Sequence, residues 1–168
     1  MLISDWCDGQ RPNRGRGRIY RVSHQSTTTP LALQVSLDAP GYHNRVGTQL
    51  YLKEIGDNAI VELRKAIKDK TLKYQGRMHA VWVLANSEGP KAMADLMEIA
   101  KSDSDSRVRV QAIRAIADLT DPILAKHRLN AGRGSSEMGD RIAKLGEGAS
   151  PRVQLEVIVA LGRLRWQS

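Results

Sequence analysis

The stretch at residues 107–119, RVRVQAIRAIADL, decides the fold class of this chain. Its apolar and small residues stand at offsets 0, 4, 7, 8 and 11, which is one stripe of a helix with 3.6 residues per turn. The preceding run at 103–105, Asp-Ser-Asp, supplies oxygens for an N-cap and negative charge at the positive end of the helix dipole. The sequence therefore predicts an amphipathic helix with a buried stripe of Val108, Ala112, Ala115, Ile116 and Leu119.

Related segments occur along the chain at intervals of 32, 32 and 45 residues. Ala112 corresponds to Ala80 and Thr48 toward the N-terminus and to Val157 toward the C-terminus. A fixed period in this range, with a second helical segment between copies, is typical of a helical solenoid. The longer last interval contains residues 130–137, NAGRGSSE, for which we expect an exposed loop.

Composition limits the class of protein. The 168 residues are 41% hydrophobic, enough for one folded domain, and the absence of Phe with abundant small aliphatic residues favours an all-α fold. The single cysteine, Cys7, excludes an intrachain disulfide, a CxxCH haem attachment and a cysteine-rich zinc site. No run of about 18 apolar residues predicts a membrane span, and no export signal opens the sequence. The sequence alone assigns no localisation.

The net charge of +8 raises the question of a nucleic-acid partner. A basic surplus attracts phosphate, but the solvated faces of solenoid helices also carry such charge. The surplus is spread along the chain, without the aromatic platforms and clustered basic stripes of dedicated binders. We therefore favour a solvated surface, and keep as the alternative an independent basic HEAT-like protein that binds nucleic acid or an acidic protein.

The first 43 residues do not have a helical pattern. Residues 2–6 and 18–22 are β-prone runs on either side of a turn-rich stretch, which predicts a β-hairpin or an irregular segment. A lone hairpin is marginally stable, so its sheet partners should lie outside this chain. We expect the hairpin within residues 1–24, a Ser/Thr/Pro-rich linker at 25–43, and a solenoid of about four helix pairs at 44–168.

Two of the repeated segments resemble HEAT repeats, in which a small polar or acidic residue and then Val-Arg mark the second helix of each pair. The better match is Asp105-Ser-Arg107-Val-Arg109, and the next is Ser150-Pro-Arg152-Val. This resemblance implies stacked antiparallel helix pairs, with the second helix of each pair facing a concave groove.

The N-terminal segment has a resemblance of its own. LISDWCDG and RGRGRIYRVSH resemble the closing strands of the β-propeller in planctomycete-type dehydrogenase-like proteins, whose propellers are similar to quinone-dependent sugar dehydrogenases. In that family HEAT repeats and commonly a cytochrome c domain follow the propeller. The resemblance implies that this chain is a fragment of an extracytoplasmic parent, and that any dehydrogenase activity belongs to the parent.

Catalytic, cofactor and metal sites are not indicated. The histidines at 24, 43, 79 and 127 share no helix face with a carboxylate at metal-ligand spacing, and no nucleophile elbow occurs. We expect a non-catalytic HEAT scaffold that binds a protein, either a domain of the parent or a second copy of itself.

The candidate partner-binding residues are Trp82, Arg107, Gln111 and Arg114. The last three stand on the outward side of one helix, and Trp82 occupies the same repeat position as Arg114. Two interpretations of Trp82 remain open, core packing and an apolar contact surface.

Overall fold

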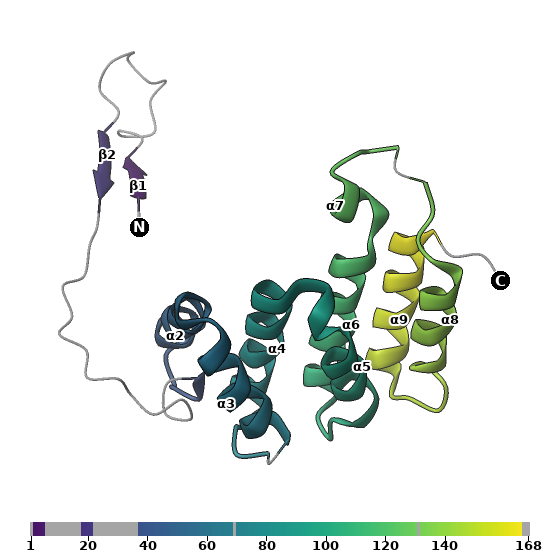
Figure 1. Cartoon of the computed structure of the whole chain (residues 1–168), viewed down its shortest axis with the longest axis horizontal. Helices are drawn as coiled ribbons and strands as arrows, with labels where there is room; N and C mark the ends of the chain where they lie inside the picture. The colour runs from purple at the N-terminus through teal and green to yellow at the C-terminus, as the bar shows by residue number, and fades with distance from the viewer. Residues whose placement is uncertain (1, 6–17, 22–36, 69, 131, 166–168) are drawn as a thin grey trace. The chain divides into compact units, whose positions relative to one another are not determined.

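The computed structural model of the chain describes residues 2–5, 18–21, 37–68, 70–130 and 132–165 (Figure 1). The chain divides into two compact units, Met1–Leu31 and Ala32–Ser168. In the first unit, β1 (Leu2–Asp5) pairs antiparallel with β2 (Arg18–Arg21), and Ile3 lies opposite Tyr20. These strands occupy the two runs for which the sequence predicts a hairpin. The ends of the predicted strands, Trp6 and Val22, lie outside the described residues.

The second unit is all-helical in its described part, as the sequence predicts. The elements are α2 (Tyr42–Ile55), α3 (Asp57–Lys68), α4 (Tyr74–Glu88), the 3₁₀ helix η2 (Gly89–Ala92), α5 (Met93–Ser102), α6 (Ser106–Thr120), α7 (Pro122–Lys126), α8 (Ser136–Lys144) and α9 (Pro151–Leu164). Within the described residues, no helix has both the length and the apolar content needed to cross a membrane.

Four of these helices, α2, α4, α6 and α9, correspond to the repeated segments. They begin at residues 42, 74, 106 and 151, which are 32, 32 and 45 residues apart, the spacing found in the sequence. Each packs on the next, and α3, α5 and α8 each pack on the one that follows in the chain. Figure 1 shows α2, α4, α6 and α9 in this order from left to right. We call these four the repeat helices.

The core lies between the repeat helices and their preceding helices. Val108, Ala112, Ala115 and Ile116 of α6 are fully buried, and Leu119 is partly buried against the core. The predicted stripe of α6 is therefore confirmed. Alanine at two of these positions lets neighbouring helices approach closely, and the larger side chains of Leu84, Leu96, Ile142 and Leu164 fill the space between them.

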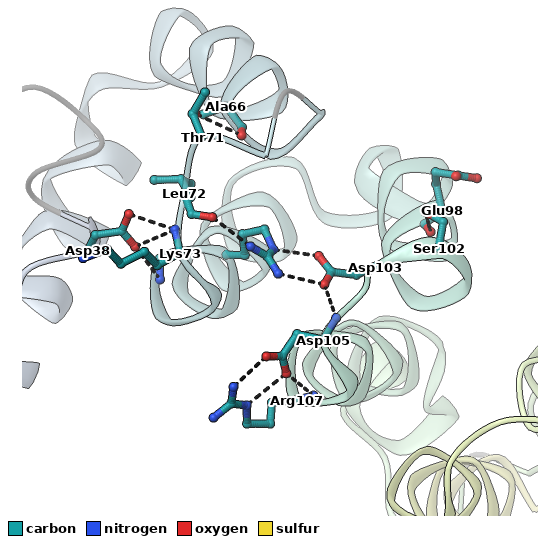
Figure 2. Close-up of polar contacts among 12 residues, drawn as sticks. Asp38, Ala66, Thr71, Leu72, Lys73, Glu98, Ser102, Asp103, Asp105 and Arg107 are labelled. Atoms are coloured by element: carbon teal, nitrogen blue, oxygen red, sulfur yellow. Dashed lines mark hydrogen bonds and ion pairs between the residues drawn. The ribbon is translucent and has the colours of Figure 1, made fainter.

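The helical unit includes residues before the expected start at 44. Leu37 is fully buried, and α2 begins at Tyr42. The Asp38 carboxylate accepts hydrogen bonds from the backbone N–H groups of Lys73, at 2.9 Å, and Gly76, at 3.1 Å (Figure 2). Because these bonds satisfy free donors at a helix N-terminus, they support the start of α4 at Tyr74.

Helix ends confirm some expectations and correct others. Asp105 caps α6, because its side chain accepts from the backbone N–H of Arg107 at 2.9 Å. Asp103 does not cap the helix by its side chain but forms an ion pair with Arg77. Ser150 stands at the N-cap of α9 without a side-chain cap bond. At the end of α2, Gly56 has a φ of 75°, which glycine adopts without strain.

The segment after α6 is less helical than the sequence predicts. We expect a helix to about residue 129, yet α7 ends at Lys126, and His127 has a left-handed φ of 51°. Leu129 is 88% exposed, so a longer helix would have no apolar face to bury. The expected loop is present up to α8, which begins at Ser136 and so includes Glu137.

Candidate partner-binding face

Trp82 of α4 and Gln111 of α6 meet where these repeat helices pack. The indole Nε1–H of Trp82 donates to Oε1 of Gln111 at 3.0 Å, and both residues are partly buried. The ring of Trp82 also packs against the core. Trp82 therefore takes part in core packing and keeps a partly exposed edge at the surface.

Arg114 of α6 forms an ion pair with Glu156 of α9. The Arg114 Nη2 and Nε atoms lie 2.8 Å and 2.9 Å from Glu156 Oε2. The Glu156 side chain is 10% exposed and the Arg114 side chain 49%. The nearly buried carboxylate of Glu156 thus binds Arg114, whose side chain remains partly exposed to solvent. This geometry orients the guanidinium before any partner arrives.

His79 of α4 joins the N-terminal pair of repeat helices. Its Nδ1 lies 3.0 Å from Oε1 of Gln49, and its Nε2 accepts from Nε of Arg45 at 3.2 Å. Because Nε2 is an acceptor, this network assigns the proton of the neutral ring to Nδ1. Burial, and then the positive charge of Arg45, lower the pKa of His79 below its ordinary 6.5.

On one side of these three contacts, the residues occupy equivalent repeat positions. His79, Gln111 and Glu156 are 32 and 45 residues apart, the same intervals that separate the helix starts. On the other side of each contact, Trp82 and Arg114 are 32 residues apart, while Gln49 stands one residue before their counterpart, Leu50. We call the pairs Gln49–His79, Trp82–Gln111 and Arg114–Glu156 the junction contacts. Since equivalent positions on packed helices lie on one side, the junction contacts define one continuous face of the repeat helices.

Arg107 lies at the N-terminal end of this face. Its guanidinium carbon is 3.4 Å from the centroid of the Tyr74 ring at the start of α4, a cation–π contact. Its Nη2 and Nε lie 2.6 Å and 2.9 Å from the two carboxylate oxygens of Asp105 (Figure 2). The hydrogen bond from the Arg107 side chain lowers the pKa of Asp105 to about 2. Arg107 is thereby held in a fixed orientation at the surface.

Of the four residues predicted from the sequence, the structure brings Trp82 and Gln111 into direct contact. Arg107 and Arg114 lie on the same helix but bind separate carboxylates. Sequence reasoning missed five members of the face, namely Gln49, His79, Glu156, Tyr74 and Arg45. The repeat spacing could have found two of them, because His79 and Glu156 stand at the position of Gln111.

Among the described residues, no group of three or more His, Cys, Asp or Glu side chains is arranged to hold a metal ion. Comparison of the chain with protein-family models, with curated proteins and with solved structures finds no match.

Proposed function

We propose that the helical unit is a non-catalytic scaffold of HEAT-like repeats that binds a protein along the face defined by the junction contacts. The observation that carries this proposal is the recurrence of these contacts at equivalent positions of successive repeat helices. A solenoid with such a face offers an extended surface on which several repeats can contact one partner.

The residue types on the face suit a protein partner. Tyr42, whose ring centroid lies 6.1 Å from that of His79, is 70% exposed, and Trp82 is partly exposed. Arg107 and Arg114 present guanidinium groups fixed by carboxylates. Trp, Tyr and Arg dominate the binding energy of protein interfaces. Side chains that are already ordered lose less conformational entropy on binding, which favours affinity.

A nucleic-acid partner is less well supported, because three arginines of the repeat helices are paired with carboxylates. Arg107 holds Asp105, Arg114 holds Glu156, and Arg163 holds Asp118, so phosphate would compete with carboxylates already in place. A groove between α3 and α5 gathers exposed lysines, but acidic residues face them. Its charged lining residues include Lys65, Lys68 and Lys70 with Asp95, Glu98 and Asp103.

The N-terminal resemblance suggests where the partner comes from. The hairpin of β1 and β2 belongs to a unit separate from the helices, as a propeller remnant would. On this basis we propose that the partner is the propeller or the electron-transfer domain of a larger dehydrogenase-like protein.

The function can be tested by comparing the proteins that are captured by the immobilised full chain with those captured by two of its variants. The face variant combines Arg107→Ala with Arg114→Gln and Glu156→Gln, which keeps hydrogen-bonding groups at the junction. The control variant, Val61→Ala with Lys65→Ala, changes exposed residues of α3 outside the face. A protein captured by the wild type and the control but lost by the face variant supports the proposal.

Two results would contradict it. One is that the face variant captures the same proteins in the same amounts as the control. The other is tight binding of a short labelled DNA duplex at physiological salt, weakening steeply as salt rises, because that dependence signals phosphate contacts.

A further inference from the structure

The outer side of α9 exposes an apolar stripe. Leu155, Ile158 and Val159 are 63%, 67% and 46% exposed, although they lie on a helix whose other side is in the core. The spacing of 45 residues makes Leu155 and Ile158 equivalent to Val110 and Ile113 of α6, which are 6% and 0% exposed. On α6 this side faces α9, because Arg114, one turn after Val110, pairs with Glu156 of α9. We call Leu155, Ile158 and Val159 the forward stripe.

The first repeat helix exposes the opposite side. Tyr51 of α2 is 49% exposed, whereas its equivalents Val83, Ala115 and Ala160 are at most 1% exposed in the other repeat helices. Ile55, one turn further, is 43% exposed. On α4, α6 and α9 this side packs against the preceding repeat helix. We call Gly47, Tyr51 and Ile55 the backward stripe.

The two stripes complement each other at the junction positions. Val159 occupies the repeat position of Trp82 and Arg114, which contact the next repeat helix. Gly47 occupies the repeat position of Gln111 and Glu156, the residues that accept those contacts. A side chain at Gly47 would meet no atom within 4 Å in the chain, so the space above it is open. If Val159 of one chain packed on Gly47 of another, this pair would bury no polar side chain without a hydrogen-bond partner.

The charges at the stripe ends also match. At the junction of α6 and α9, Arg163 Nη2 lies 2.6 Å from Asp118 Oδ1. Asp118 and Arg163 occupy the same repeat position, 45 residues apart, and in α2 that position holds Glu54, which is exposed. A junction of α9 with an α2 would therefore bring Glu54 near Arg163, a residue of opposite charge that also pairs with Asp118 and Asp121 of its own chain.

We propose that two copies of this chain associate head to tail, with the forward stripe of one copy packed on the backward stripe of the next. Such a contact continues the series in which α2, α4, α6 and α9 pack in order. Because it joins different surfaces of identical chains, it is heterologous and can extend beyond a dimer. The proposal does not depend on the partner-binding face.

Sedimentation velocity on the full chain over a range of concentrations tests this association. One variant blocks the forward stripe with Leu155→Glu and Ile158→Glu, and another blocks the backward stripe with Tyr51→Glu and Ile55→Glu. The wild type should shift from monomer toward dimer and larger species, and each blocked variant should stay monomeric. The control Val61→Glu, on the exposed side of α3, should associate like the wild type.

Mixing the two blocked variants distinguishes a head-to-tail contact from a symmetric one. The two blocked variants retain one intact stripe each, of opposite kind, so a one-to-one mixture should form a heterodimer and nothing larger. A symmetric contact of α9 with α9 would instead let the backward-blocked variant dimerise alone and give no complementation. That result overturns the proposal, as does a wild-type chain that remains monomeric at all concentrations.

A cross-linking measurement tests the same contact and does not depend on the folding of the glutamate variants. In a Cys7→Ser background, Val159→Cys on one chain and Gly47→Cys on another should form a disulfide between chains under mild oxidation. The Val159→Cys chain alone should form little. Equal cross-linking of the Val159→Cys chain with itself would contradict the head-to-tail arrangement.

Discussion

Arg77 of α4 and Asp103, the residue that follows α5, form a bidentate ion pair. Arg77 Nε lies 2.8 Å from Asp103 Oδ2 and Nη2 lies 3.0 Å from Oδ1, with the two side chains 11% and 9% exposed. Nη1 of Arg77 also donates to the carbonyl of Leu72 at 2.8 Å, and Asp103 accepts from the backbone N–H of Asp105. Figure 2 shows how these bonds connect the segments before α4 and α6.

Removing Asp103 should be among the most destabilising surface changes. Asp103→Ala leaves the Arg77 guanidinium nearly buried without its carboxylate, and breaking such a pair costs about 3–5 kcal/mol. Urea unfolding followed by circular dichroism measures the loss. The matched control, Asp118→Ala, removes a carboxylate that is 40% exposed, so its cost should stay below about 1 kcal/mol. Equal losses in the two variants would show that the Arg77 pair contributes no more than a solvent-exposed one.

Gly76→Ala should destabilise the protein although alanine is the better helix former. The added Cβ would collide with Oδ1 of Asp38 and approach the Leu72 side chain, so the bonds of Asp38 to α4 would break. Loss of a helix cap costs about 0.5–2 kcal/mol. Thermal unfolding should show a lower Tm. In the control, Gly162→Ala meets no atom within 4 Å and should raise stability by up to about 1 kcal/mol.

Stability should fall as the pH drops below about 6.5 because of His79. Its folded pKa is lowered, so between that value and 6.5 the unfolded chain binds a proton that the folded chain does not. The stabilisation is full above 6.5 and is lost as pH falls toward the folded pKa. Protonation at Nε2 would also remove the acceptor for Arg45. The check is the free energy of unfolding from pH 7.5 to 5.

The His79→Gln variant is the control for this pH dependence. Glutamine does not titrate in the range, so the remaining slope belongs to other groups. The wild type should show the steeper decline, and parallel curves would mean that His79 has the same pKa in both states.

Arg114→Ala should cost about 1–3 kcal/mol, because it leaves the Glu156 carboxylate, 10% exposed, without its charged donor. Arg152→Ala, at an exposed position of α9, should change stability by less than about 0.5 kcal/mol. Replacing both partners, as Arg114→Met with Glu156→Met, should recover most of the loss, since no buried charge remains. Failure of the double variant to recover would assign the loss to packing and not to the charge.

Much of this fold can be predicted from the helical pattern of the sequence. The spacing of the repeated segments locates α2, α4, α6 and α9, and the stripe of α6 predicts which of its residues are buried. Both follow from short-range periodicity, which each helix contains within itself. The N-cap role of Asp105 is local for the same reason.

Contacts between distant residues could not be predicted in this way. Asp38 caps α4 from 35 residues away, and Gly76 near its start argues locally against a helix there. The pairing of Asp103 with Arg77 likewise depends on how α5 packs, so a carboxylate that looks like a cap has another partner. In the candidate site, Trp82 and Gln111 were predicted separately, but their hydrogen bond appears only when α4 and α6 are in place.

The junction contacts differ in chemistry although their positions are equivalent. The pair at His79 responds to protons, the pair of Trp82 and Gln111 is neutral, and the pair of Arg114 and Glu156 is ionic. In the proposed HEAT-like array, neighbouring repeats contact each other through such local interfaces, so each junction can weaken by itself. Mild acid should therefore weaken the contact of α2 with α4 before the contact of α6 with α9, because only the first contains a histidine whose pKa is lowered by folding.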